Sequence, residues 1–171
     1  MALPKTPFLP ADGKIAISDN TGTPIVLTIA YEDGDLQITG LKSGFKTTQV
    51  FKNRGKHYSV RKVEHQAVAF SFTAHATGII DAADGSIPAA LLGLAGTPWA
   101  TPVTTAPANT GDGDLRQLKW TGERTDFGGT ADTTITLKYC DCEFDFAEGV
   151  PGKFSVKGEA YILAGDAVAF T

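Results

Sequence analysis

The sequence has no long apolar run and contains only two cysteines. No stretch approaches the roughly 18 apolar residues that a membrane-spanning helix needs, so we expect no membrane insertion. The opening residues MALPKTPFLPADGK contain no apolar signal-peptide core, so we expect the chain to fold in the cytosol. Cys140 and Cys142 lie on the same face of an expected strand, where the geometry for a disulfide is poor. The sequence therefore predicts two free, buried thiols.

Recognisable catalytic motifs are also missing. The sequence contains no Gly-x-Ser-x-Gly motif, no phosphate-binding loop and no dinucleotide fingerprint. Its three histidines, His57, His65 and His75, have no recognised metal-ligand spacing with the cysteines. These absences predict a protein that is not an enzyme and that has no catalytic residue, cofactor-binding site or metal site.

Two groups of carboxylates invite a functional interpretation. The cluster from Glu32 to Asp35 lacks the ordered spacing and the closing glutamate of a calcium loop, which favours a plain turn. Asp141, Glu143 and Asp145 resemble a hydrolase acid pair. However, three carboxylates that face one way beside two lysines are more typical of a solvated strand face.

The composition favours one domain rich in β-structure. A length of 171 residues suits a single domain, and 19 glycines and nine prolines favour many turns and short strands. The net charge of −4 disfavours a phosphate-binding surface. Prolines at positions 4, 7 and 10 predict an extended arm over residues 1–13, which is either a disordered terminus or an arm lying on a neighbouring subunit. We expect residues 14–171 to form the domain itself.

Local signals divide this domain into short elements. The expected strands are Lys14–Ser18, Ile25–Tyr31, Leu36–Leu41, Phe45–Phe51, Tyr58–Val63, Ala67–Thr77 and Leu115–Thr121. The Glu32–Asp35 turn is expected to join the second and third of these strands as a hairpin. One short helix is expected over Ser86–Ala95, capped by Ser86 and ended by Gly96, where it would cover an open face of the β-structure. Residues 97–114 form a long loop whose role stays open.

The clearest pattern is a long hairpin from Asp132 to Leu163. Apolar and charged residues alternate on both of its strands, so one face is apolar and the other is charged. A five-residue loop connects the strands. The predicted register pairs Phe144 with Phe154, Cys142 with Val156, Asp145 with Lys153, Glu143 with Ser155, and Asp141 with Lys157.

The apolar phase of the first hairpin strand changes near Tyr139. Ile135 and Leu137 are apolar at odd positions, whereas Cys140 and Phe144 are apolar at even positions. This change indicates either a bulge within one domain or a strand that serves two sheets or two subunits.

A basic turn follows the strand that ends near Phe51. Four lysine or arginine residues lie between Lys52 and Arg61, a density that suggests nucleic-acid binding. No aromatic platform or known binding motif accompanies them, so a solvated loop or a subunit contact is favoured.

The order of these features resembles the tail tube (major tail) proteins of long-tailed bacteriophages. The resemblance rests on three runs of sequence, with the short helix between the second and the third. These runs are EDGDLQITGL, FKNRGKHYSVRKVEHQAVAFSFTAH and TITLKYCDCEFDFAEGVPGKFSVKGEAYI. It covers nearly the whole chain as a similarity of pattern.

The resemblance implies a β-sandwich or barrel-like domain with one flanking helix, closing into a ring across subunits. Six-membered rings would stack into a hollow tube through which DNA leaves the virion. Two hairpins would line the channel, here Phe45–Thr77 and Thr133–Leu163. The residues expected to face the channel are Asp141, Glu143, Asp145, Lys153 and Lys157. Those expected to make contacts between rings are Lys52, Asn53, Arg54, Gly55 and Lys56 in the turn, and Pro4, Pro7 and Phe8 in the arm.

Further partners and locations follow from the same resemblance. The subunit would bind copies of itself and the tail-tip initiator, tape-measure and tail-terminator proteins, and DNA would pass through without specific recognition. It would assemble in the bacterial cytoplasm and reside in the virion tail. Two other functions stay open. One is a carbohydrate- or surface-binding β-sandwich, and the other is the related tube protein of a type VI secretion or contractile-tail system.

Overall fold

The computed structural model of the chain describes residues 13–19, 24–29, 34–76, 86–94, 96–100, 115–123, 131–163, 165 and 167–171. Within these residues the protein is mainly β-structure with one short α-helix. The strands are β1 (Gly13–Ser18), β2 (Val26–Ile29), β3 (Gln37–Thr39), β4 (Lys46–Asn53), β5 (Lys56–His65), β6 (Val68–His75), β7 (Arg116–Gly122), β8 (Thr133–Ala147), β9 (Lys153–Ala160) and β10 (Val168–Phe170). The helix is α1 (Ile87–Leu92), and two 3-10 turns cover Ser43–Phe45 and Pro98–Ala100.

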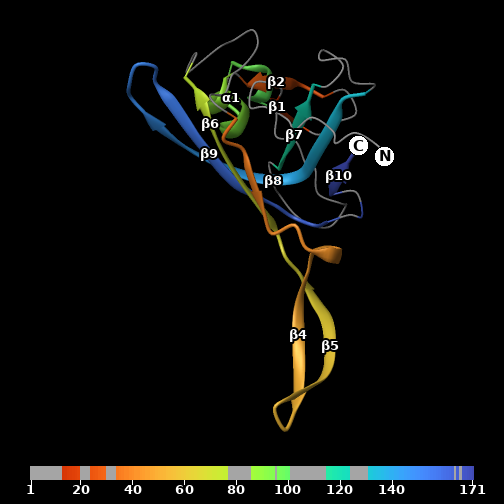
Figure 1. The fold of residues 1–171 in the computed structure, drawn as a ribbon. Helices are drawn as coiled ribbons and strands as arrows, with labels where there is room; N and C mark the ends of the chain where they lie inside the picture. Colours follow the sequence, from red (N-terminus) through yellow and green to blue (C-terminus); the bar gives the residue numbers. More distant parts are fainter. Residues whose placement is uncertain are drawn as a thin grey trace, which may run out of the picture.

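Eight of the strands form one antiparallel sheet, in the order β2-β1-β7-β8-β9-β6-β3, with β10 also pairing with β8. The other two, β4 and β5, form a separate hairpin that extends away from the rest of the molecule (Figure 1). The chain thus has a body and a projecting arm. We call the arm, residues Lys46–His65, the β4–β5 hairpin.

Strand β8 spans 15 residues and connects the two halves of the sheet. One half contains β2, β1, β7 and β10, and the other contains β9, β6 and β3. Its first half pairs with β7 and β10, and its second half pairs with β9 (Figure 1). Between Leu137 and Cys140 two residues of β8 oppose only Gln117 of β7, and Tyr139 has a φ of 57°. This is a β-bulge, as the phase change in the sequence predicted, and it turns the apolar side chains of both halves towards one core.

The core lies between the two halves of this bent sheet. Apolar residues at alternate positions of β1, β6, β7, β8 and β9 are buried together with the helix and Trp99. In β6, for example, every second residue is buried, because successive strand side chains point to opposite faces. The alternating sequence pattern of each body strand therefore determines which face packs inward.

Helix α1 begins as predicted but ends early. The backbone N–H of Ala89 donates to the side-chain oxygen of Ser86 over 3.3 Å, so Ser86 is the N-cap. The C-cap is Gly93, with a left-handed φ of 60°, and not Gly96. A side chain at Gly93 would also come within 3.1 Å of the Trp99 carbonyl oxygen, so this close approach requires glycine.

Two predictions about strand pairing are wrong. Strands β2 and β3 do not form a hairpin, because β2 pairs with β1 and β3 pairs with β6. Residues Phe45–Thr77 are not one hairpin either, since β4 and β5 pair with each other while β6 joins the main sheet. The last residues of the chain contain a further strand, β10, which was not among the expected strands.

The register of the β8–β9 hairpin differs from the prediction by two residues. Phe144 lies opposite Val156, Phe146 opposite Phe154, and Asp141 opposite Glu159. A shift of two residues keeps every side chain on its predicted face, so the faces were predicted correctly although the pairs were not. In the separate ladder between β6 and β9, Gly158 lies opposite Phe70, and a methyl group at Gly158 would come within 2.8 Å of the Phe70 ring.

Candidate functional site

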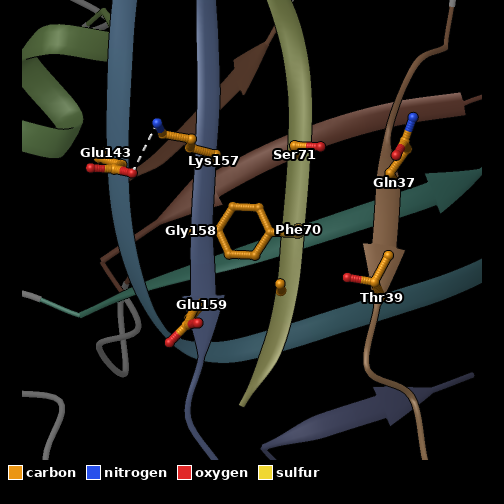
Figure 2. A pocket seen from close by; sticks show the side chains of 9 residues that line it. Gln37, Thr39, Phe70, Ser71, Glu143, Lys157, Gly158 and Glu159 are labelled. Carbon is orange, nitrogen blue, oxygen red and sulfur yellow. Dashed lines mark ion pairs between the residues drawn. The ribbon is translucent and has the colours of Figure 1, made fainter.

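The polar face of four adjacent strands is the first candidate surface. Strands β3, β6, β9 and the second half of β8 present rows of polar side chains on the side away from the core (Figure 2). One row of cross-strand partners is Gln37, Ser71, Lys157 and Glu143, and the next is Thr39, Ala69, Glu159 and Asp141. We call this surface the polar sheet face.

A shallow hollow of about 350 Å³ lies on this face. Gln37, Thr39 and Ser71 line one side of it, and charged residues of β8 and β9 line the other. Gly158 also lines the hollow, and the ring of Phe70 lies beside this glycine (Figure 2). The rim of the hollow is therefore polar and charged.

The charges on the polar sheet face are mostly negative. The ammonium of Lys157 is 3.2 Å from a carboxylate oxygen of Glu143 and 3.8 Å from one of Asp145. The hydrogen bond to Glu143, followed by the charges of Glu143 and Asp145, raises the pKa of Lys157. Each of these three side chains is largely exposed, so the ion pairs contribute little to folding.

Two further carboxylates face each other without a lysine between them. Asp141 and Glu159 are direct cross-strand partners, both exposed, and like charges in this arrangement repel each other. The neighbouring Tyr161 has a raised pKa, first because of desolvation and then because of the charges of Glu159 and Asp141. The face thus keeps a negative surplus after Lys157 is paired.

The predicted channel-facing residues share this surface. Asp141, Glu143, Asp145 and Lys157 are exposed on the polar sheet face. Lys153 is half-buried at the end of β9, opposite Ala147 and His75. Among the described residues, no group of three or more histidine, cysteine, aspartate or glutamate side chains is placed to hold a metal ion.

The β4–β5 hairpin is the second candidate surface. Its tip has two linking residues, Arg54 and Gly55, with φ values of 49° and 79°, as in the two-residue turns that suit the twist of a hairpin. It contains six lysines or arginines and one glutamate. Its net charge is therefore +5, and since the whole chain carries −4, the remainder carries −9.

Apolar side chains on this hairpin are exposed. Tyr58 is 79% exposed and Val60 is 59% exposed, and Val50, Phe51 and Val63 also face solvent. The hairpin is held at its base, where Gln66 N–H donates to the Phe45 carbonyl oxygen over 2.8 Å and Lys42 donates to the Gln66 side chain over 2.9 Å. An isolated two-stranded hairpin has little stability of its own, so these exposed groups are suited to cover by a partner.

Only some of the residues predicted to make contacts between rings lie in the described part of the chain. Lys52, Asn53, Arg54, Gly55 and Lys56 form the tip of the β4–β5 hairpin, as expected for a turn. Pro4, Pro7 and Phe8 lie outside the described residues, as does most of the 97–114 loop. His57 and His65 lie on the hairpin and His75 lies on β6, so the three histidines do not form a common site.

Comparison of the chain with protein families, curated proteins and solved structures finds no match. The two surfaces above are therefore the basis for assigning a function. Within the described part of the chain, no helix is both long enough and apolar enough to cross a membrane.

The prediction of two free, buried thiols is confirmed in part. Both cysteines are free, Cys140 is buried and Cys142 is half-buried. Burial raises the pKa of the Cys140 thiol to about 12, and it also raises the pKa of Cys142. Neither thiol is activated as a nucleophile, because a reactive cysteine requires a lowered pKa.

One important side chain, Arg116, was not singled out in the sequence. It is buried, its Nε donates to the Ala90 carbonyl oxygen over 2.8 Å, and its guanidinium carbon lies 5.6 Å from the centre of the buried Trp99 ring. The available signal was its spacing, since Arg116 shares the phase of the buried Leu118 on β7. Arg116 links the sheet to α1 and serves the fold.

Proposed function

We propose that this protein is a structural subunit that self-assembles into stacked hexameric rings and forms the tail tube of a long-tailed bacteriophage. The observation that carries this proposal is the β4–β5 hairpin. It projects from the body, exposes apolar side chains and has a charge opposite to that of the remainder. In a stack of rings, the neighbouring ring would cover this arm, with the tip from Lys52 to Lys56 in the contact.

The polar sheet face supports the proposal as a channel wall. It extends over four strands and carries more carboxylates than lysines. DNA is retained by contacts between its phosphates and lysine or arginine, so a mildly negative wall would let DNA slide during genome ejection. The residues proposed to face the lumen are Asp141, Glu143, Asp145, Lys153 and Lys157.

The partners of such a subunit are other copies of itself, the tail-tip initiator, the tape-measure protein and the tail terminator. DNA passes through the lumen without sequence-specific recognition. The subunit would assemble in the bacterial cytoplasm and reside in the virion tail, and it would not act as an enzyme.

Negative-stain electron microscopy of the concentrated protein tests this proposal. We expect rings and hollow tubes with six-fold end views. A triple variant, Lys52→Glu, Arg54→Glu and Lys56→Glu, is expected to lose the tubes while it keeps the melting temperature of the wild type. The matched control is Lys119→Glu, which reverses an exposed charge on the body and is expected to keep the tubes.

Other outcomes favour other functions. A protein that stays monomeric at every concentration, also with purified tail-tip complexes, would contradict a tube subunit. The carbohydrate-binding alternative needs exposed tryptophans, but Trp99 is buried and Trp120 is half-buried. Tubes enclosed in a contracting sheath would favour the type VI secretion or contractile-tail alternative.

A further inference from the structure

A buried cation lies where strand β7 meets helix α1. Arg116 and Trp99 are each 2% exposed, and the guanidinium carbon of Arg116 lies 5.6 Å from the centre of the Trp99 ring. The Nε of Arg116 donates to the Ala90 carbonyl oxygen over 2.8 Å. The two side chains form one buried group, which we call the Arg116–Trp99 cluster.

Two nitrogen donors of this cluster have no acceptor among the described residues. They are Nη1 of Arg116 and Nε1 of Trp99, and both atoms are buried. Burying an unpaired donor costs free energy, and burying a charge without a counter-charge costs far more. Buried polar groups are for this reason almost always paired, either with the protein itself, with water or with an ion.

The described groups around Arg116 do not balance its charge. The ion pairs within the described part of the chain join other side chains, and Asp141 of β8 is exposed on the opposite face. Cys140 lies opposite Arg116 in the β7–β8 ladder, and burial raises the pKa of its thiol to about 12. Burial also raises the pKa of Cys142, although the positive charge of Arg116 acts in the other direction. Both thiols are therefore neutral near pH 7 and supply no negative charge.

We propose that the Arg116–Trp99 cluster binds a small monovalent anion of the halide class, such as chloride. The anion accepts hydrogen bonds from Nη1 of Arg116 and Nε1 of Trp99 and neutralises the buried charge. A halide suits this position better than water, because water pairs the donors but leaves the charge of Arg116 uncompensated. The site lies in the core of the single subunit, so it exists whether or not the subunit forms a tube.

Thermal unfolding tests this site when sodium chloride replaces sodium gluconate at constant ionic strength. Gluconate is too bulky for a buried site, so it serves as the reference anion. A ligand that binds only the folded state stabilises that state with the logarithm of its concentration above Kd. We therefore expect the wild-type Tm to rise by about 3 to 5 °C for each tenfold increase in chloride.

Arg116→Gln removes the buried charge, and Lys119→Gln is its matched control. Lys119 is an exposed lysine on the same strand. We expect Arg116→Gln to lose the chloride response and Lys119→Gln to keep it, which separates a specific site from the general effect of salt. If Arg116→Gln does not fold, Trp99→Phe takes its place. That variant keeps an aromatic ring and removes one donor, so we expect its response to need an at least about tenfold higher chloride concentration.

Anomalous scattering from wild-type crystals grown in sodium bromide locates the ion directly. We expect a bromide peak within hydrogen-bond distance of Nη1 of Arg116. Bromide peaks only at surface lysines would overturn the anion site. A wild-type Tm that is the same in chloride and in gluconate would overturn it as well, because the donors would then be paired by water or by the chain itself.

Discussion

Strands of the body and strands of the β4–β5 hairpin differ in what they bury. In β6 every second residue is buried, whereas nine of the ten residues of β5 are exposed and the tenth is half-buried. Both segments contain valine and aromatic residues, so composition does not explain the difference. The body strands have a second layer to pack against, and the hairpin has none within the described residues. Apolar groups on the hairpin are therefore available for contacts with other chains.

The largest effect on stability is expected when phenylalanine is replaced by alanine in the body, compared with the same replacement in the β4–β5 hairpin. Phe72→Ala removes a ring that is 3% exposed, and we expect it to lower the free energy of unfolding by about 3 to 5 kcal/mol. Phe51→Ala removes a ring that is 41% exposed, and we expect less than about 0.5 kcal/mol. Urea unfolding of both variants measures the difference. Equal losses would show that the hairpin is already packed in the single chain.

A methyl group added at Gly158 is expected to have the next largest effect. It would lie 2.1 Å from the Asp141 carbonyl oxygen and 2.8 Å from the Phe70 ring, so β8 and β9 must separate. We expect Gly158→Ala to cost about 1 to 3 kcal/mol, as overpacking in a core does. Gly165→Ala is the control, since that position has open space around it. A stable Gly158→Ala variant would contradict the close packing of β6, β8 and β9.

The third prediction concerns the buried thiol of Cys140, which lies in the body. We expect this thiol to make the free energy of unfolding depend on pH. The pKa of Cys140 is about 12 in the folded chain against 9.0 for a free thiol. Below pH 9 the thiol is protonated in both the folded and the unfolded state, so its ionisation does not change the free energy of unfolding. Between pH 9 and 12 only the unfolded thiol ionises, so stability falls by about 1.4 kcal/mol per pH unit.

Urea unfolding at pH 8 and pH 10 measures this loss. The Cys140→Ala variant serves as the control, because it keeps Cys142, whose pKa is raised first by burial and only then by the charge of Cys140. We expect the wild type to lose about 1 kcal/mol more than this variant between the two pH values. An equal loss in both proteins would show that Cys140 ionises freely in the folded chain.

The smallest effect on stability is expected for a substitution on the polar sheet face. Lys157→Ala removes the ion pairs with Glu143 and Asp145, but these side chains are exposed and their interaction is screened by water and salt. We expect a melting temperature within measurement error of the wild type. Lys153→Ala provides a comparison at a half-buried lysine of the same strand. A clear loss for Lys157→Ala alone would show that the polar face contributes to folding.

Local patterns predicted several elements because the information for them lies within a few residues. The faces of β8 and β9 follow from strict alternation, and the bulge near Tyr139 follows from a break in that alternation. Ser86 caps α1 because its side chain reaches an N–H three residues ahead. The basic residues from Lys52 to Lys56 were predicted as a turn for the same reason.

Pairing between distant segments was predicted poorly. The two-residue error in the β8–β9 register leaves the alternating pattern unchanged, so local sequence cannot detect it. The other neighbour of β9 is β6, a strand far earlier in the chain, which places Phe70 beside Gly158. The turn predicted over Glu32–Asp35 likewise says nothing about which strand β3 will join.

The sequence by itself determined most of the strands, their inner and outer faces, the start of the helix and the contrast between a basic segment and an acidic remainder. These properties depend on residue type and on spacing along the chain. Only the tertiary structure decided that β3 joins β6, that Arg116 is buried against α1, and that residues 46–65 leave the body as an arm. These outcomes depend on contacts between residues far apart in sequence, whose energies no local pattern contains.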